Sequence, residues 1–229
     1  MTRSRTLRGL VLATVTACAL SSCADHPGSA AVVGSEQISD SRLEDVAGAF
    51  CALASASAQT QQQPQQQDSR TARLQALGVL IDDSLSRQYA ATEGVEPDQE
   101  QVSAFIQRSE QTLDALPAEE RSVFRATLTE YAEAQLSMIE LGKRELQEAG
   151  TANPTEQQAL TEATRLRSAW AAKNADVSVD PRYGTYAKGA LQPADGSLSV
   201  AVSKDAVAGA RATPGPTWIA SLPANQKCA

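Results

Sequence analysis

The chain has 229 residues and a net charge of −7, which becomes −10 without the three arginines of residues 1–22. An acidic chain without a Lys/Arg-rich patch is not expected to bind nucleic acid or anionic lipid headgroups. Aromatic residues are only 4% of the chain, whereas alanine, glutamine, glutamate and leucine are abundant. This composition favours a mostly helical protein with a modest core, in one domain.

Residues 1–22 have the pattern of a secretory signal. Three arginines precede the apolar run Leu10–Leu20, which is too short to span a membrane as a mature helix. The sequence Leu20-Ser21-Ser22-Cys23 resembles a bacterial lipobox. This resemblance implies a lipoprotein signal peptide (1–22), lipidation of Cys23, and a lipid anchor in the cell membrane on the extracytoplasmic face. The alternative is an ordinary signal peptide cleaved nearby, with Cys23 as a bystander.

Residues 23–30 are small, polar and interrupted by Pro27-Gly28, which predicts a flexible tether between the lipid and the fold. The tether holds His26, the only histidine of the chain, and a solvated side chain is a better interpretation of it than a ligand. The fold itself therefore has no histidine for a Ser/His or Cys/His pair or for a zinc site.

The folded part is predicted to open with a strand, a turn and a returning strand. Ala31–Val33 is the first strand, Gly34-Ser35 the turn, and Glu36-Gln37-Ile38 the return. Ser41 and Glu44 then have the spacing of a capping box that begins a helix. The glutamine-rich stretch Gln59–Gln67, which is interrupted by a proline, is predicted to be a loop after this helix.

Helical periodicity predicts four more helices before the pattern changes at Val177. Their expected ranges are Ser69–Thr92, Asp98–Ala115, Ala118–Ala149 and Pro154–Asn174. In the first of them, one apolar face is expected to be formed by Leu74, Leu77, Ile81, Leu85 and Tyr89. Pro117 is expected at the first position of the third helix, and Asn153 as the cap of the fourth.

Beyond Val177 the sequence favours strands and turns. Leu198, Val200 and Val202 alternate with small or polar residues and predict a strand that pairs with Ala31–Val33. Residues 212–229 are expected to form an irregular, proline-rich tail. The predicted fold is therefore a mostly α domain over residues 31–211, a bundle of about five helices with a small β element that pairs N-terminal and C-terminal strands.

No catalytic motif or metal-ligand spacing is found, so no catalytic residue, metal or cofactor is predicted, and the chain is not expected to be an enzyme. The acidic pairs Asp82-Asp83, Glu119-Glu120 and Glu130 with Glu133 lie on predicted polar faces, which favours solvated surface over a carboxylate dyad. Asp176, Asp180 and Asp195 flank turns; turn chemistry explains them as well as calcium ligation does.

Two segments resemble the N-terminal domain of SurA/PrsA-type extracytoplasmic chaperones. In the first, AVVGSEQISDSRLED, the matching residues are Val33, Glu36, Ile38, Ser39 and Leu43, while Gly34-Ser35 replaces an Asn-Gly turn. The second is Asp180–Tyr186, similar to a Pro-Arg-Phe/Tyr-Gly-x-Trp segment late in such chains. The resemblance implies a chaperone-like helical module. The last helix leads almost directly to Asp180, which leaves no room for the parvulin prolyl-isomerase domain.

A disulfide between Cys51 and Cys228 is predicted by elimination. Cys18 leaves with the signal and Cys23 is consumed by lipid, so two thiols remain in an oxidising compartment. The alternative is two unpaired thiols, with Cys51 as a small core residue.

The expected function is that of a membrane-anchored lipoprotein that binds unfolded or extended exported polypeptides, without prolyl-isomerase activity. The alternative is a structural or interaction lipoprotein that binds one folded envelope partner. A large exposed apolar groove would favour the first, and a flat polar helix face the second.

Overall fold

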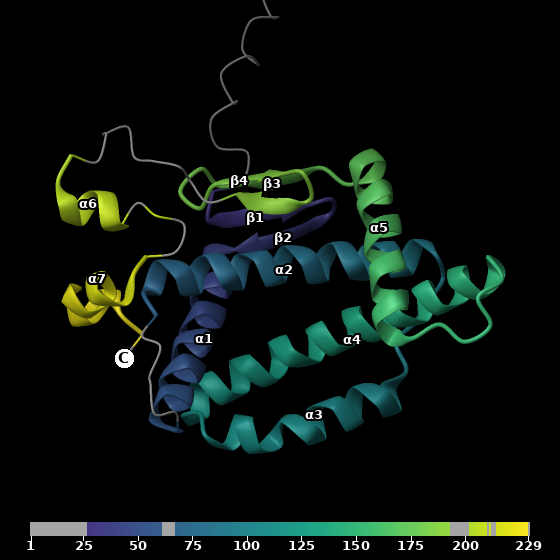
Figure 1. Ribbon diagram of the computed structural model, residues 1–229, viewed down its shortest axis with the longest axis horizontal. Coiled ribbons are helices and arrows are strands. Elements are labelled where there is room, and N and C mark those ends of the chain that lie inside the picture. The colour runs from purple at the N-terminus through teal and green to yellow at the C-terminus, as the bar shows by residue number, and fades with distance from the viewer. Residues whose placement is uncertain (1–26, 61–66, 193–201, 210, 212–213, 229) are drawn as a thin grey trace, which may run out of the picture.

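The computed structural model describes residues 27–60, 67–192, 202–209, 211 and 214–228 (Figure 1). Within them the strands are β1 (Ser29–Val33), β2 (Glu36–Ser39), β3 (Val177–Val179), β4 (Thr185–Ala187) and β5 (Ala190–Gln192). The helices are α1 (Asp40–Thr60), α2 (Ser69–Thr92), α3 (Gln99–Asp114), α4 (Ala118–Glu148), α5 (Glu156–Asn174), α6 (Lys204–Gly209) and α7 (Pro216–Ser221), followed by the 3₁₀ turn η1 (Ala224–Gln226).

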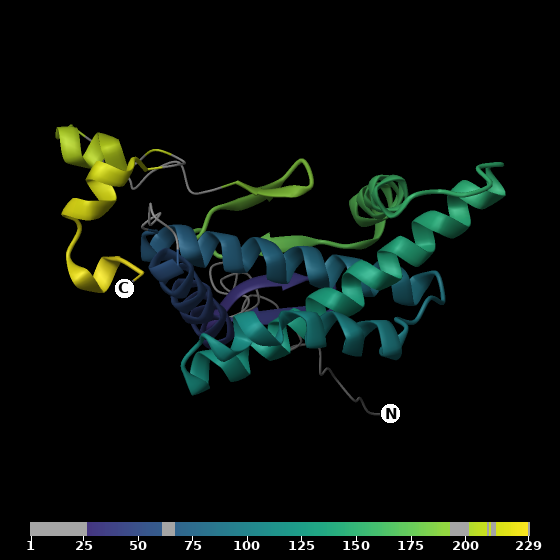
Figure 2. The same ribbon diagram turned by 60° about the horizontal axis from the view of Figure 1, so that its bottom comes forward.

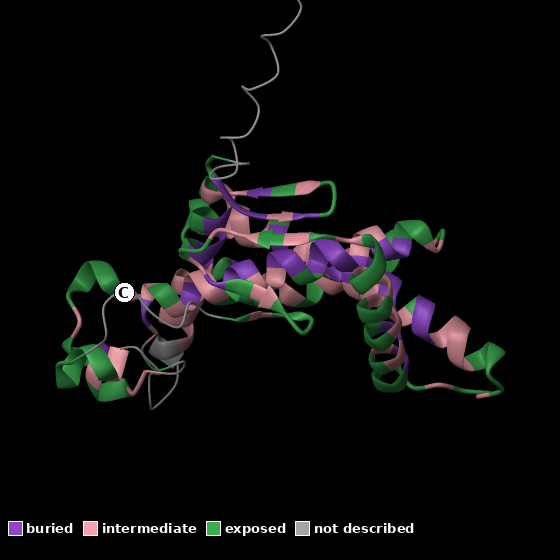
Figure 3. Ribbon diagram, turned by 90° about the horizontal axis from the view of Figure 1, so that it is seen from above, coloured by how far each residue is buried: buried purple, intermediate pink, exposed green. Residues whose placement is uncertain are grey.

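The central element is α2, whose predicted range is confirmed. Its amino end is capped by Asp68, whose side chain accepts a hydrogen bond from the Thr71 amide. The helix ends before Gly94, which has φ +66°. The helix packs against α1, α4, α5 and the sheet (Figure 1). It is therefore buried on most of its circumference, and Figure 3 shows buried residues along its whole middle part. The single apolar face expected from periodicity underestimates this burial.

The small β element joins the two ends of the helical part, as predicted, but through a different strand. The sheet order is β2-β1-β3, and both pairings of β1 are antiparallel. Because β2 and β3 occupy both edges of β1, the predicted pairing of Ala31–Val33 with the segment Leu198–Val202 is wrong. Residues 198–201 of that segment lie outside the described residues. The strand β1 itself begins at Ser29, two residues earlier than expected.

Three helix starts differ from the predictions in the residue that caps the helix or in the position of the predicted residue. At α1 the Ser39 hydroxyl accepts from the Arg42 amide at 3.1 Å, so the Ser41 capping box is not formed. At α4, Pro117 is the cap residue rather than the first helical residue. At α5, Thr155 and Gln158 form a capping box in place of the expected Asn153 cap. In addition, α1 continues through Thr60, and residues 61–66 of the predicted loop lie outside the described residues.

Two apolar clusters hold these elements together. The first joins β1 and β2 to α1 and α2, with Val33, Leu43, Leu77 and Ile81 fully buried. The second joins α2, α4 and α5 around Tyr89, Met138, Leu141 and Ala163. In contrast, α3 packs only on α4 to any large extent, and its contacts are partly exposed. Among the described residues, no helix is both long enough and apolar enough to cross a membrane.

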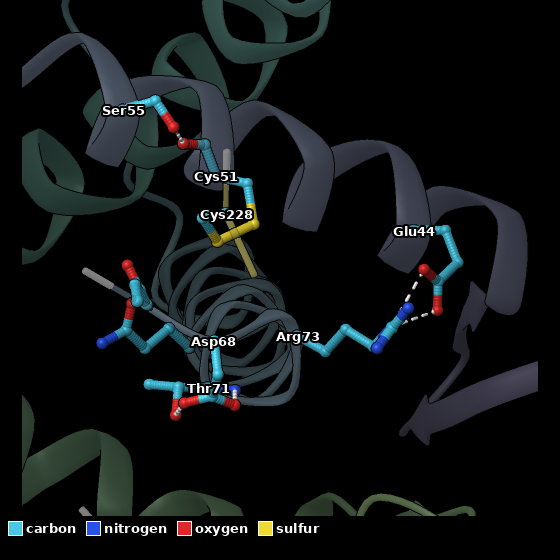
Figure 4. The surroundings of a disulfide bond; sticks show 9 residues. Glu44, Cys51, Ser55, Asp68, Thr71, Arg73 and Cys228 are labelled. Atoms are coloured by element: carbon cyan, nitrogen blue, oxygen red, sulfur yellow. Dashed lines mark hydrogen bonds and ion pairs between the residues drawn. A yellow bond between two sulfur atoms is a disulfide. The ribbon is translucent and has the colours of Figure 1, made fainter. Parts of the chain in front are cut away.

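The C-terminal segment lies beside the amino end of α2 (Figure 2). Ile219 of α7 is buried, and the Cys228 amide donates to the Gln67 carbonyl at 2.9 Å. The sulfurs of Cys228 and Cys51 lie 2.00 Å apart, at the distance of a disulfide bond (Figure 4). In its described part, the expected irregular tail therefore contains one short helix and a 3₁₀ turn.

Candidate functional site: a groove between α2 and α4

A cavity of about 370 Å³ opens between the carboxyl end of α2, the loop that follows it, and the middle of α4. Ala90, Ala91 and Val95 give it apolar walls, and its charged lining residues are Arg87, Glu96 and Glu133. Small, mostly apolar walls with a few charged groups are typical of sites that hold a side chain or a short extended segment. No sequence pattern pointed to this groove, because its two walls come from residues between 36 and 50 positions apart.

The outer wall of the groove is fixed at both ends. Gly94 ends α2 in the left-handed conformation, and the Val95 amide donates to the Ala90 carbonyl at 2.9 Å. On the far side, Asp98 caps α3 by accepting from the Glu100 amide at 2.9 Å. The Arg144 guanidinium of α4 lies 3.3 Å from the Glu93 carboxylate and ties the loop to α4. Hydrogen bonds and an ion pair thus hold the loop at both of its ends.

The charged inner end of the groove belongs to a polar network. Arg87 donates to both carboxylate oxygens of Glu36 on β2, at 2.9 and 3.1 Å, and the Ser84 hydroxyl donates to the same carboxylate at 2.6 Å. Glu130 of α4, 3.9 Å from the Arg87 Nη1 atom, accepts from Arg42 of α1 at 3.0 Å. The network links β2, α1, α2 and α4, and holds the Arg87 guanidinium at the groove. This corrects the expectation that Glu130 is simply solvated.

Asp83 is buried beside this network, contrary to the prediction of a solvated acid. It lies one turn before Arg87, is 3% exposed, and its Oδ2 atom has no hydrogen-bond partner among the described residues. Burial raises the pKa of Asp83 to about 7, while the nearby Arg87 and Arg167 oppose this shift and Asp82 and Glu130 add to it. A carboxyl group is therefore kept largely neutral in the interior at mildly acidic pH.

Asp83→Asn is expected to stabilise the protein at pH 8 by about 2 kcal/mol, and by less at pH 5. The pKa of Asp83 is higher in the folded than in the unfolded protein, so between these two pKa values the native state binds one proton more than the unfolded state. The stability contributed by protonated Asp83 is complete below the unfolded pKa and is lost as pH rises through about 7. Urea unfolding from pH 5 to pH 8 measures the effect. The exposed Asp45→Asn should leave the pH dependence unchanged; equal profiles for all three proteins would contradict the assignment.

The two segments that carried the family resemblance contact each other. Arg182 donates from Nη2 to both oxygens of Asp40, at 3.1 and 2.8 Å, and the Tyr183 hydroxyl donates to Asp40 at 3.2 Å. Asp180 is paired with Arg182 in turn, and this pairing lowers the pKa of Asp180. Asp180 is therefore a salt-bridge partner, and among the described residues no three His, Cys, Asp or Glu side chains gather as a metal site.

The other predicted site residues stand as follows. Cys23 and His26 lie outside the described residues, as does Asp195. Cys51 and Cys228 lie next to each other beside the amino end of α2 (Figure 4). Neither cysteine lines the groove, so the predicted pair would join the C-terminal segment to α1 and would not form part of the candidate binding site.

The fold is that of a helical module in which a three-stranded sheet joins the ends and a groove opens between two helices. The family described as SurA-like N-terminal domain matches residues 6–132, and the chain belongs to this family. SurA-like domains are extracytoplasmic, chaperone-type, non-catalytic modules that bind polypeptides. Neither the curated proteins nor the solved structures give a match. The family match ends within α4, so α5 and the late segment around Arg182 extend beyond it.

Proposed function

We propose that this chain is a membrane-anchored chaperone-like module that binds extended segments of exported polypeptides in the groove between α2 and α4. The observation that carries the proposal is the groove itself: apolar walls, one basic and two acidic residues, and a volume of about 370 Å³ in a domain of a polypeptide-binding family. Apolar walls suit the side chains that an unfolded polypeptide exposes, because their burial there is favourable. The apolar part of its walls supports the chaperone proposal over that of a structural lipoprotein.

The groove is not accompanied by an isomerase domain between the last bundle helix and the sheet. Helix α5 ends at Asn174 and β3 begins at Val177, so the chain passes from one to the other through two residues. This supports binding without prolyl isomerisation by such a domain. A second function, recognition of one folded envelope partner, remains the alternative that the experiment below separates.

Filling the groove is expected to abolish binding without unfolding the domain. Ala91 lines the groove from the last turn of α2 and is exposed, so Ala91→Trp adds an indole at the mouth without displacing buried atoms. In an aggregation assay with a chemically unfolded client, the wild type should suppress aggregation at equimolar ratio and Ala91→Trp should lose most of that effect. The matched control is Ala172→Trp, at an exposed alanine of α5 outside the groove.

If the wild type does not suppress aggregation and a pull-down yields a single folded partner, the chaperone proposal is overturned. The interaction lipoprotein would then take its place. Equal suppression by both tryptophan variants would place client binding outside this groove.

We propose further that Cys23 carries the lipid that holds the domain at the extracytoplasmic face of the membrane. The support is the lipobox-like sequence, because a diacylated cysteine supplies two chains, enough for stable anchoring. Cys23→Ser should move the protein from the membrane fraction to the soluble fraction of cells. Retention of Cys23→Ser in membranes washed with high salt would show that the anchor lies elsewhere.

A further inference from the structure

Three arginines from distant parts of the chain line a second, smaller cavity of about 170 Å³. Arg70 and Arg73 come from the first turns of α2, and Arg182 comes from the segment after β3, with Leu74 and Tyr183 completing the walls. No Lys/Arg-rich patch was expected from the sequence, and the three arginines that meet here lie beside the carboxylates of Glu44, Asp40 and Asp180. The arginines are isolated or paired in sequence and meet only when β3 docks beside β1.

Neighbouring carboxylates hold two of these guanidinium groups by one edge only. Arg73 donates from Nε to the two oxygens of Glu44 at 2.7 and 2.9 Å (Figure 4). Arg182 uses Nε and Nη2 for Asp180 and Asp40, and its guanidinium lies over the Tyr183 ring at 5.2 Å. Neither Nη atom of Arg73, nor the Nη1 atom of Arg182, donates to any residue that the structure describes. Two of the arginines that line the cavity therefore keep three Nη atoms without a partner among the described residues.

The cavity also lies next to the point where the chain leaves the proposed anchor. The Asp40 amide donates to the Gly28 carbonyl at 2.8 Å, and the same Asp40 holds Arg182. Gly28 follows Cys23 by five positions, so their Cα atoms are at most about 17 Å apart when the chain is fully extended. A lipid on Cys23 thus keeps this cavity within reach of the headgroup layer.

We propose that this arginine cavity binds a phosphate group, supplied by the headgroups of the membrane to which the chain is anchored. Planar guanidinium groups match phosphate oxygens with paired, charge-assisted hydrogen bonds. The carboxylates of Glu44, Asp40 and Asp180 lower the affinity for an anion, so weak binding is expected, and the test below therefore uses phosphate and lipid at millimolar concentration. The contact would orient the domain on the membrane. The proposal depends on the lipid anchor only for the source of the phosphate.

The test uses the mature chain, residues 23–229, with Cys23→Ser so that no lipid contributes. Its binding is measured by flotation with vesicles of phosphatidylglycerol and phosphatidylcholine, and its binding of inorganic phosphate by phosphorus NMR line broadening. Arg73→Gln is expected to weaken both by about tenfold, the loss typical of a charge-assisted pair. Arg70→Gln is a second variant of the cavity. Arg165→Gln, the same charge change on exposed α5, should retain both activities.

The outcomes separate the sources of the anion. Vesicle binding that depends on Arg73 and is displaced by inorganic phosphate supports the proposal. Binding of inorganic phosphate without binding to vesicles overturns the membrane as the source of the phosphate. Equal losses of binding in Arg73→Gln and Arg165→Gln overturn the arginine cavity as the binding site. No binding of either probe also overturns it. Because the protein tested carries no lipid, these results are independent of whether Cys23 is the anchor.

Discussion

Gly142→Ala is expected to destabilise the protein by about 3 kcal/mol or more, although alanine is the better helix former. A Cβ at Gly142 on α4 would lie 1.9 Å from the carbonyl oxygen of Ala159 on α5, and 2.7 Å from its Cα. Those atoms belong to the backbone, so the two helices must separate to admit one methyl group. Separation would open the apolar cluster of Tyr89, Met138 and Leu141. Urea and thermal unfolding measure the loss.

Gly48→Ala provides the matched control within the same fold. Gly48 lies inside α1, is exposed, and a Cβ built on it meets no atom within 4 Å. Without a clash, only helix propensity acts, and the substitution should stabilise the protein by about 0.5–1 kcal/mol. Opposite signs for the two variants are the expected result. A Gly142→Ala protein as stable as the wild type would contradict the close approach of α4 and α5.

The second large effect is expected from breaking the pair Cys51 and Cys228, which we propose form a disulfide bond in the envelope. The bond would close a loop of 177 residues, and the chain-entropy model assigns such a loop as much as about 5 kcal/mol. Other contacts of the C-terminal segment, such as the Cys228 amide with Gln67, reduce the loss. Reduction of the disulfide bond should therefore lower the free energy of unfolding by several kcal/mol. We also expect residues 214–228 to detach from α2.

Urea unfolding with and without reductant measures this effect, and hydrogen exchange locates it. The double variant Cys51→Ala with Cys228→Ser should have the stability of the reduced wild type and be insensitive to reductant. The existence of the bond is tested first, by alkylation of unreduced, denatured protein purified from its native envelope. Two alkylatable thiols there would refute the bridge, whatever the distance between the sulfurs.

Local chemistry made most of the helices predictable. The bounds of α2 agree with the expectation at both ends, because an acidic cap precedes Ser69 and a glycine follows Thr92 within two residues. For α3, Asp98 and Ala115 were expected as the first and last helical residues, and in the structure they are the caps. The helix starts that were predicted wrongly are those where several capping residues compete within a few positions, as Ser39 does with Ser41.

Burial of polar groups was not predictable from the same patterns. Asp83 follows another aspartate on a helix with one evident apolar face, and such a pair is ordinarily solvated. The helix is enclosed on more than one side by α1, α4 and α5, so a residue off the apolar face is covered as well. Periodicity reports the contrast between faces of one helix; it carries no information on how many neighbours that helix has.

The helical class and the SurA-like family could be inferred from short stretches of sequence, since each depends on residues within a few positions of one another. The secretion signal and the bond between the two cysteines stay predictions from the same kind of local pattern and from simple elimination. The groove, the arginine cavity and the contact of Arg182 with Asp40 depend on residues up to 142 positions apart. Such residues meet only because β3 pairs with β1 and α4 crosses α2. Long-range pairings of this kind depend on the summed packing of the whole core, which no local pattern specifies.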